Sequence, residues 1–449
     1  MQIRQVVALA DKSQVVNALL LDLEQLGLQI SKGSSLDSSD SSSKLIICDP
    51  GFEATSQGST ILHQALDCGC SVLMDPRSYP SVLKEIGETG GLSEKTRREL
   101  AAYAIYRCIE ADARRLSDLS GPSPMYLAEI LEKVQDLRYG ENWHQKAALY
   151  RKPRGIGLFS AKKLNGREMS YNNVVDAEAV LEMLMDLSEY DGVRDERALS
   201  VIVKHANPCG IAYGKSLDEA YHRSFCTDPK SAFGGVIGFD RPVDVATAEA
   251  IGDSFVEVLM APGFDPEALK FLTEKKPNRR ILDLGDMLER KDELYYQGKC
   301  FRGILGGAMV QDCDTDDIKE WKVVTKRSPT DVENRSLRFA WKVAKYVKSN
   351  ALVYTDENMT LGIGSGQVSR VDSARFGAEK AEEHGLSTKG SVAATDSFFP
   401  FRDGLDQTFK AGATAVVHPG GSIRDAEVIQ AADEHGMAMV FTGMRHFRH

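Results

Sequence analysis

Residues 201–210 read Val-Ile-Val-Lys-His-Ala-Asn-Pro-Cys-Gly, an apolar β-branched run that ends in a lysine and a histidine before a proline and a glycine. The run predicts a buried strand. Successive side chains of a strand point to opposite faces, so Lys204 and His205 can serve one pocket only if the strand ends at them. We expect Pro208 and Gly210 to end it. A lysine beside an imidazole that titrates near neutrality suits proton transfer; an edge lysine beside a structural histidine is the alternative interpretation.

The composition indicates a globular protein of two or three domains, because the 449 residues are 42% hydrophobic and 27% charged. The formal net charge of −10 argues against a nucleic-acid partner. No run of about 18 apolar residues occurs, and charged residues interrupt the N-terminal apolar stretch, so we expect neither a membrane span nor a secretory signal. Eight cysteines without a dense framework fit a reducing compartment, and we expect a cytoplasmic protein.

The only close pair of cysteines is Cys68 and Cys70, with a histidine nearby at position 63. This arrangement resembles one corner of a metal site. No second cluster of cysteine and histidine completes four ligands, so we expect a buried thiol pair and no zinc.

The first 133 residues alternate between predicted strands and helices, with a helical pattern after Asp11-Lys12-Ser13 and Ser93 as the cap of a later helix. The expected strands are residues 6–10, 44–48 and 71–74, and the expected helices follow Ser13 and Ser93 as far as Leu26 and Leu116. The second helix should bury Leu100, Ala104, Cys108 and Ile109. The serine-rich residues 31–43 have almost nothing to bury, which predicts a mobile loop. Residues 121–134 are expected to form a linker helix.

From residue 134 onward a pattern of strand, turn and helix repeats, which is typical of α/β architecture, and two α/β halves are the natural partition. Helices are expected at 176–187 and 331–348. The second of these should place Leu337, Trp341, Ala344 and Val347 on a core-facing side. Further strands are expected at 351–355, 360–363, 392–395 and 413–417.

Three loops in the last hundred residues suit ligands. Residues 362–370, Gly-Ile-Gly-Ser-Gly-Gln-Val-Ser-Arg, have the wrong spacing for a dinucleotide fingerprint, but they place Arg370 at a helix start, which suits a carboxylate or a phosphate. Residues 419–422, Pro-Gly-Gly-Ser, offer a second helix start. For both segments, the alternative interpretation is a plain turn that binds no ligand. The aromatic residues of 398–401 either fill a core or form a wall for a flat ligand. No Gly-x4-Gly-Lys-Ser/Thr sequence occurs, so an acyl or one-carbon donor should arrive already activated.

A set of motifs occurs in one order along the chain. They are Leu-Arg-Tyr-Gly-Glu-Asn at 137–142, Lys204-His205 with Asn207-Pro208, Asp-Pro-Lys-Ser-Ala-Phe-Gly-Gly at 228–235, Lys348-Ser349-Asn350, the 362–370 loop, Ser-Phe-Phe-Pro-Phe-Arg-Asp at 397–403, Gly421-Ser422 and an arginine-rich C-terminus. Together they resemble the purine-biosynthesis transformylase/cyclohydrolase family. The resemblance covers residues 134–449 almost continuously and the N-terminal domain in part.

The resemblance implies a formyltransferase of de novo purine biosynthesis. Such an enzyme moves the formyl group of 10-formyltetrahydrofolate to the 5-amino group of aminoimidazole carboxamide ribonucleotide (AICAR), giving formyl-AICAR and tetrahydrofolate. It implies that His205 accepts the proton of the amine, and that Lys204 stabilises the transition state or protonates the departing folate nitrogen. Asn350 would steady the developing oxyanion. An amine conjugated to a carboxamide is a weak nucleophile, so its deprotonation by a histidine suits the reaction.

The resemblance also implies two sets of binding residues. Those expected around the ribonucleotide are Arg138, Tyr139, Phe233, Gly234, Glu257, Phe398 and Arg445. Those expected around folate are Arg370, Asp403, Ser422 and Ile423. It further implies a homodimer with active sites between the subunits and room for a monovalent cation. The implied fold could suggest zinc, but neither a His-x-Glu nor a Cys-x2-Cys signature is present, so we expect no zinc.

The implied fold is a methylglyoxal-synthase-like α/β domain at 1–133, followed by two cytidine-deaminase-like α/β subdomains at 134–325 and 326–449. The sequence departs locally from the family pattern, because the family's Asn-Pro-His is Asn142-Trp143-His144 here. Tryptophan in place of proline leaves the backbone angle φ unrestrained and adds bulk, which alters the loop.

The N-terminal domain resembles the cyclohydrolase domain only at residues 10–13, 75–80 and 90–97. The family's ring-closing loops have no match between them, so we expect a domain without cyclohydrolase activity. The alternatives are a bifunctional enzyme that also closes formyl-AICAR to inosine monophosphate, and a non-catalytic nucleotide- and folate-binding protein.

Overall fold

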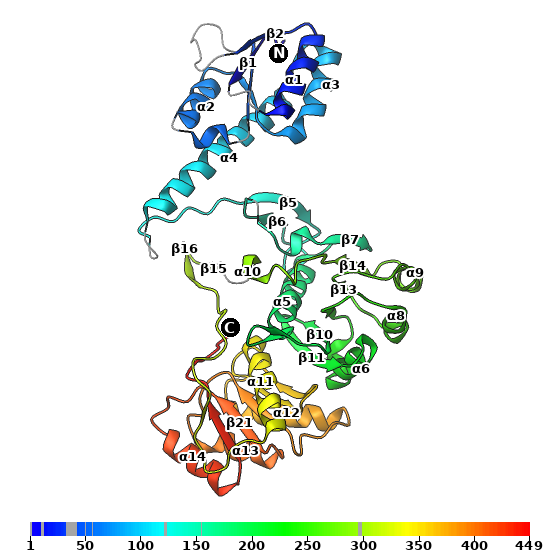
Figure 1. Ribbon diagram of the computed structural model, residues 1–449, viewed down its shortest axis with the longest axis vertical. Coiled ribbons are helices and arrows are strands. Elements are labelled where there is room, and N and C mark those ends of the chain that lie inside the picture. Colours follow the sequence, from blue (N-terminus) through cyan, green and yellow to red (C-terminus); the bar gives the residue numbers. More distant parts are fainter. Residues whose placement is uncertain are drawn as a thin grey trace. The chain divides into compact units, whose positions relative to one another are not determined.

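The computed structural model (Figure 1) describes residues 2–9, 13–32, 43–49, 51–55, 57–120, 124–153, 155–294 and 299–449. The chain forms two compact units. The first comprises Met1–Glu132 with Arg151–Arg154, and the second Lys133–Tyr150 with Gly155–His449. Within the described ranges, every helix is too short or too polar to cross a membrane.

The first unit is a four-stranded parallel sheet in the order β2-β1-β3-β4, covered by helices on both faces. Its elements are β1 (Gln5–Leu9), α1 (Gln14–Gln25), β2 (Gln29–Lys32), β3 (Lys44–Cys48), α2 (Gly58–Asp67), β4 (Ser71–Leu73), α3 (Tyr79–Thr89) and α4 (Glu94–Leu119). Helices α1 and α3 pack on one face of the sheet, and α2 packs with α4 on the other (Figure 1). Apolar side chains on both faces of its strands explain why the sheet needs two helical layers.

Most expected elements of the first unit are confirmed, and Ser93 caps α4 as predicted. Ser13 caps α1, a role that the sequence pattern did not indicate. Three expectations are wrong. Ile109 is 45% exposed rather than buried, Cys68 is exposed while Cys70 is buried, and the described part of 121–134 contains no helix. The Gly-Pro-Ser-Pro sequence at 121–124 explains the last, because proline removes donors and disfavours helical residues before it.

Two expectations fall on residues outside the described part of the chain. These are the loop at Ala10, Asp11 and Lys12, and most of the serine-rich loop, residues 33–42. The first residues of that tract, Ser31 and Lys32, belong to strand β2, which pairs with β1.

The second unit contains two six-stranded sheets with the same topology. The first is ordered β11-β10-β12-β13-β14-β7 and the second β19-β18-β20-β21-β22-β17. In both, the first three strands are antiparallel neighbours, the next two pairs are parallel, and the last pair is antiparallel. The expected α/β architecture, repeated in two halves, is confirmed at this level.

The elements of the two halves follow one another in the same order. The first half comprises β7 (Lys162–Asn165), α5 (Tyr171–Leu187), β10 (Ala198–Lys204), β11 (Asn207–Gly214), α6 (Leu217–Thr227), β12 (Val236–Phe239), α8 (Val245–Ile251), β13 (Val258–Ala261), α9 (Pro266–Lys275) and β14 (Arg280–Asp283). The second comprises β17 (Lys322–Val323), α11 (Asp331–Tyr346), β18 (Leu352–Thr355), β19 (Thr360–Gly364), α12 (Arg370–Glu383), β20 (Val392–Thr395), α13 (Arg402–Lys410), β21 (Ala415–His418), α14 (Asp425–Glu434) and β22 (Ala438–Phe441). Smaller additions are β5 (Glu132–Leu137), β6 (Ala147–Arg151), β8 (Glu189–Tyr190), β9 (Val193–Arg194), α7 (Pro229–Ala232) and α10 (Lys291–Leu294).

Helices α5 and α11 share the central core of the second unit with the facing sides of both sheets. The expected core side of α11, with Leu337, Trp341, Ala344 and Val347, is buried as predicted. Asp186 of α5 accepts hydrogen bonds from Lys342 at 2.9 Å, Lys345 at 3.2 Å and Tyr346 at 2.8 Å. Burial alone would raise the pKa of Asp186, but the two lysines lower it to about 2, so the buried carboxylate stays charged and joins the two halves.

The sheets also meet where β11 lies against β19. The Ile211 N–H donates to the Thr360 hydroxyl at 3.0 Å, and the Thr227 hydroxyl donates to the Thr360 carbonyl at 2.7 Å. Edge strand β11 is thereby covered, which satisfies polar groups that an open sheet edge would leave exposed.

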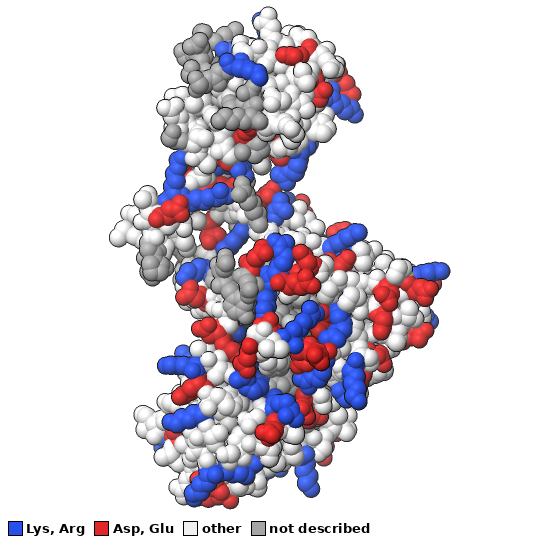
Figure 2. All heavy atoms as spheres, in the orientation of Figure 1, with Lys and Arg blue, Asp and Glu red and all other residues white. Residues whose placement is uncertain are grey.

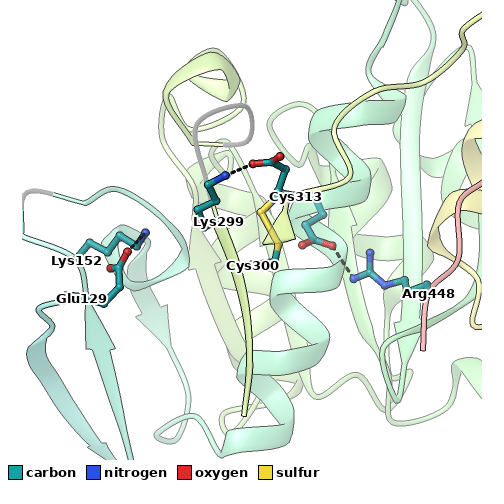
Figure 3. Close-up of a disulfide and its surroundings, with 8 residues drawn as sticks. Glu129, Lys152, Lys299, Cys300, Cys313 and Arg448 are labelled. Atoms are coloured by element: carbon teal, nitrogen blue, oxygen red, sulfur yellow. Dashed lines mark hydrogen bonds and ion pairs between the residues drawn. A yellow bond between two sulfur atoms is a disulfide. The ribbon is translucent and has the colours of Figure 1, made fainter. Parts of the chain in front are cut away.

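An exposed hairpin of β15 (Lys299–Ile304) and β16 (Gly307–Asp312) projects from the second unit. A disulfide between Cys300 and Cys313 closes its base, beside the ion pair of Lys299 and Asp312 (Figure 3). The cysteine count alone favoured thiols in a reducing compartment, and this pairing differs from that expectation.

Acidic and basic side chains are interspersed on the face shown in Figure 2.

Candidate active site

The predicted strand end at Lys204 is confirmed, and it forms a two-residue hairpin turn. Lys204 pairs with Asn207 across strands β10 and β11, which leaves His205 and Ala206 as the turn residues. Their φ angles are +57° and +56°. Such turns favour glycine or asparagine, and non-glycine residues held in left-handed geometry gather at functional sites.

Pro208 and Gly210 do not end the strand as expected, because both lie inside β11. The pairing register shifts between Ile202 and Val203, so Cys209 forms a bulge. Proline is tolerated at such a bulge on an outer strand. Gly210 serves packing instead: a Cβ there would lie 1.9 Å from the Ser224 carbonyl oxygen of α6.

The turn opens into a cavity of about 420 Å³, here called the turn cavity. Exposed His205 and half-buried Lys204 line it, and Lys204 Nζ donates a hydrogen bond to the Phe233 carbonyl at 2.7 Å. Cys209 lies in the wall, where burial raises the pKa of its thiol to about 12. The thiol therefore stays protonated near neutral pH.

The second half completes the turn cavity through Ile363, Ser365 and Lys380. Lys380 Nζ donates to Asp228 at 2.7 Å, and the Ser231 N–H donates to the same carboxylate at 2.9 Å. Burial would raise the pKa of Asp228, but these hydrogen bonds lower it below the ordinary value. The ion pair fixes the 228–235 segment against α12.

Asn350 belongs to a segment that is tied to the turn. Asn207 of the turn accepts a hydrogen bond from the Lys348 N–H at 3.0 Å. The Asn350 amide donates to the Gln367 carbonyl at 2.8 Å and accepts from Arg370 at 2.7 Å. The structure thus gathers the 204–207 turn, 348–350 and the 362–370 loop at one place.

Arg370 begins helix α12 as predicted, but it faces inward. Its guanidinium also donates to Asp396 at 2.9 Å and to Thr395 at 3.2 Å. Burial lowers its pKa. Its contacts therefore orient Asn350, a role that the sequence pattern did not indicate.

A second cavity, of about 390 Å³ and here called the arginine cavity, contains Arg138 and Glu257. The loop between the two cavities carries Phe233 and Gly234. Gly234 N–H donates to the Phe255 carbonyl at 2.8 Å, and the Phe233 and Phe255 rings lie 5.1 Å apart. Phe233 itself is 62% exposed. Tyr139 is placed beside Arg138, whose guanidinium donates to its hydroxyl at 2.7 Å.

The remaining candidates lie on loops of the second half. Phe399, not Phe398, fills the core: it is fully buried 5.3 Å from the His418 ring, while Phe398 is half-buried. Asp403 is exposed at the start of α13. Ser422 is half-buried and Ile423 fully exposed, between β21 and α14.

His418 holds the loop between β21 and α14 through a hydrogen bond. Its Nδ1 accepts the Gly420 N–H at 3.1 Å, and burial lowers its pKa to about 3. The ring is therefore neutral at physiological pH and can accept that hydrogen bond.

The C-terminal residues divide between the surface and the core. Arg445 is exposed, with its guanidinium 4.4 Å from the Phe447 ring, and it lines neither cavity. His446 is buried and lies 2.7 Å from an Asp314 oxygen. His446 therefore belongs to the core although its neighbours Arg445 and Phe447 are exposed.

Sequence reasoning missed Lys380 in the turn cavity, and Lys276 and Arg279 in the arginine cavity. The pair Arg279-Arg280 at the start of β14, directly before Ile281 and Leu282, was an available signal for two adjacent cations at a strand start. Among the described residues, no group of three histidine, cysteine or acidic side chains is arranged to hold a metal ion.

Comparisons with known proteins agree on one family. The profile of the AICARFT/IMPCHase bienzyme matches residues 69–380. A bifunctional purine biosynthesis protein PurH of Persephonella marina is 46% identical over 388 residues, which are 84% of this chain and 73% of the relative. Proteins of the same name from Acidithiobacillus ferrooxidans and Myxococcus xanthus are each 45% identical, over 393 and 387 residues, covering 85% and 84% of this chain and 73% of each relative.

Proposed function

Because the chain belongs to the AICARFT/IMPCHase bienzyme family, we propose that it transfers the formyl group of 10-formyltetrahydrofolate to the 5-amino group of AICAR, in de novo purine biosynthesis. The single observation that carries this proposal is the hairpin turn that presents Lys204 and His205 in one cavity, hydrogen-bonded through Asn207 to the segment of Asn350.

In this proposal His205 takes the proton of the amine as the amine attacks the formyl carbon. Its exposed ring at the turn is free to approach a substrate, which a histidine buried among apolar residues is not. Lys204 stands beside it as a cation, or proton donor, for the departing folate nitrogen. Asn350 donates to the oxyanion, and Arg370 orients that amide.

The arrangement also supports the two expected binding sets. Arg138 and Glu257 line the arginine cavity, and the Gly234 N–H donates to the carbonyl of Phe255 in its wall, which suits a ribonucleotide with its reactive amine at His205. The expected folate set belongs to the second half, with Arg370 at the start of α12, Asp403 at the start of α13, and Ser422 and Ile423 between β21 and α14. Phe398, expected around the ribonucleotide, lies between β20 and α13.

The finer fold assignment is part of the proposal. The matching topology of the two six-stranded sheets supports two related subdomains, cytidine-deaminase-like at 134–325 and 326–449. The parallel sheet of the first unit supports a methylglyoxal-synthase-like domain at 1–133.

We further propose a homodimer with active sites between subunits. Arg445 lines neither cavity within one chain, so a phosphate held by both Arg138 and Arg445 needs a second copy. The β15–β16 hairpin exposes Phe301, Ile304, Leu305 and Met309, an apolar surface of the kind that subunits bury.

A second activity, closure of formyl-AICAR to inosine monophosphate, is favoured by two observations. The three relatives are named as bifunctional, and the family match begins at residue 69, inside the first unit.

One incubation separates these outcomes. The purified chain is mixed with AICAR and 10-formyltetrahydrofolate, tetrahydrofolate release is followed by absorbance, and the purines are separated by chromatography. Accumulation of formyl-AICAR indicates the transferase alone, and inosine monophosphate indicates both activities. Release of no tetrahydrofolate overturns the proposal. The variant His205→Ala, expected to bind AICAR without turnover, distinguishes a chemical role from a binding role.

A further inference from the structure

The disulfide of Cys300 and Cys313 borders a cavity of about 390 Å³, here called the hairpin cavity. Both cysteines line it, together with side chains of α5 and α11 and the C-terminal residues Phe447 and Arg448. Figure 3 shows the disulfide and Arg448, whose guanidinium donates to Glu182 of α5 at 2.7 Å. Cys300 is exposed and Cys313 is half-buried. A small thiol in solution can therefore reach Cys300, and thiol–disulfide exchange depends on such access.

The hairpin has contacts that hold its two strands together without the disulfide. Strands β15 and β16 pair along their whole length, and Lys299 also forms an ion pair with Asp312. Cys300 lies inside this ladder opposite Gln311, whereas Cys313 follows its last pair. The disulfide therefore adds one constraint, which ties Cys313 and the residues directly after it to the hairpin.

The residues after Cys313 hold the C-terminal segment. An Asp314 carboxylate oxygen lies 2.7 Å from Nδ1 of His446, and the Asp317 carbonyl oxygen lies 3.1 Å from its Nε2. His446 is 1% exposed, and its ring lies 5.0 Å from the Trp341 ring. Asp314 thus connects a residue of the disulfide, its neighbour in the chain, to a buried histidine.

The C-terminal segment holds the residues around Asn350 in turn. The His446 N–H donates to the Asp396 carbonyl at 3.0 Å. The Ser349 N–H donates to the Arg448 carbonyl at 2.9 Å, and Ser349 directly precedes Asn350. Contiguous contacts therefore run from the disulfide through the C-terminal segment to the amide that is proposed to steady the oxyanion.

We propose that Cys300 and Cys313 form a reversible thiol–disulfide site that controls formyl transfer, and that its reactants are low-molecular-mass thiols and their disulfides. The proposal rests on the proposed function for the activity that the site controls. With the disulfide closed, Asp314 is fixed and holds His446, so the oxidised form is the more active one. Reduction frees the residues after Cys313 and loosens that hold.

The exchange reaction balances in two steps. A reagent thiolate attacks Sγ of the exposed Cys300, the bond between the two cysteine sulfurs breaks, and Cys313 leaves as a thiolate. A second reagent thiolate then attacks the reagent sulfur of the mixed disulfide and releases Cys300. The reagent departs as its own disulfide, having supplied both electrons, and the two cysteines keep the two protons of the reagent thiols. Oxidation by a low-molecular-mass disulfide reverses these steps.

The first experiment follows the disulfide and the activity along one redox titration. The full chain is equilibrated at graded ratios of reduced to oxidised glutathione. Alkylation and mass spectrometry give the fraction of the disulfide, and tetrahydrofolate release gives kcat. We expect kcat to fall about fivefold to tenfold on reduction, with the same midpoint as the disulfide. A wild-type kcat that stays constant while the disulfide is reduced overturns the proposal.

Serine variants identify the thiols that respond. Cys300→Ser and Cys313→Ser should show the low kcat at every glutathione ratio. Cys68→Ser is the matched control, because Cys68 is an exposed thiol of the first unit, and it should follow the wild type. A redox response that persists in Cys300→Ser overturns the assignment of this pair.

Asp314→Ala distinguishes transmission through His446 from a general loss of stability. It removes the carboxylate beside His446 but leaves both cysteines, so the disulfide should titrate as in the wild type while kcat is low in both states. Asp316→Ala, which removes an exposed carboxylate two residues further on, should keep the full response of kcat. An unchanged response in Asp314→Ala overturns the route through His446.

Hydrogen exchange measures the same coupling without turnover. Reduction should speed exchange of the Ser349 and His446 N–H groups about tenfold, as read by mass spectrometry of the peptides that contain them. If the wild type shows this response but transfers no formyl group, the proposed function fails and the thiol–disulfide site stands. If formyl transfer proceeds while neither kcat nor exchange responds to reduction, the site fails and the proposed function stands.

Discussion

The guanidinium of Arg370 donates a hydrogen bond to the Asn350 side-chain oxygen at 2.7 Å. The amide nitrogen of Asn350 is held in turn by the Gln367 carbonyl at 2.8 Å. The orientation of this amide is therefore fixed by groups that flank it in space but not in sequence. Its presentation to a substrate depends on both contacts.

Replacement of Arg370 by lysine should impair catalysis more than binding. A single ammonium cannot reach Asn350, Asp396 and Thr395 together. We expect kcat to fall roughly tenfold with a smaller change in KM for AICAR, measured by tetrahydrofolate release. Arg375→Lys, on the exposed part of the same helix and paired with Asp372 at 2.9 Å, is the control. An unchanged kcat for Arg370→Lys would show that the Asn350 orientation has no catalytic role.

The left-handed turn should tolerate glycine but not a branched residue at Ala206. Ala206 has φ +56°, a geometry that valine adopts with strain of roughly 1–3 kcal/mol. We expect Ala206→Val to displace His205 and lower kcat roughly tenfold to a hundredfold, whereas Ala206→Gly keeps activity. Equal activity of the two variants would contradict a strained turn.

Sequence reasoning identified the strand end at Lys204 because apolar periodicity stops there, and identified α11 because its buried residues recur at helical spacing. It failed at Pro208, where a bulge allows proline inside an outer strand. It also missed Arg279 and Lys380, since their roles depend on groups brought close by the fold. Local pattern reveals where an element ends, but not which distant charges face that end.

The buried carboxylate of Asp186 should be essential for stability. Asp186→Asn removes the counter-charge of Lys342 and Lys345, which remain buried. We expect a loss of about 3–5 kcal/mol in the free energy of unfolding, measured by denaturant titration. Asp191→Asn, whose side chain is 77% exposed in its ion pair with Arg338, should cost less than about 1 kcal/mol. Similar losses in both variants would contradict the prediction.

The ion pair of Lys380 and Asp228 should influence acid stability. The pKa of Asp228 is lowered in the fold, so its charge stabilises the protein above the unfolded value of about 3.9. This contribution is lost as the pH falls through the folded-state pKa. Lys380→Met removes the hydrogen bond that lowers the pKa, so acid unfolding should begin at higher pH.

Circular dichroism during acid titration measures the shift. The control is Lys389→Met, an exposed lysine outside this cluster. His384 lies 3.1 Å from Asp228 and persists in both variants, so it does not account for a difference between them. Identical titration curves for the wild type and Lys380→Met would contradict the prediction.

The positions of Lys204 and His205 at the hairpin turn depend on the number of residues in strand β10. Strand β10 is paired on both sides, with β11 and with β12, and its length places Lys204 last and His205 first beyond it. One residue inserted or deleted between Ala198 and Lys204 would preserve apolar character, yet it would exchange the side chains that face the two cores on either side of β10 and change which residues reach the turn. For this segment, evolution can exchange one apolar residue for another far more readily than it can change their number.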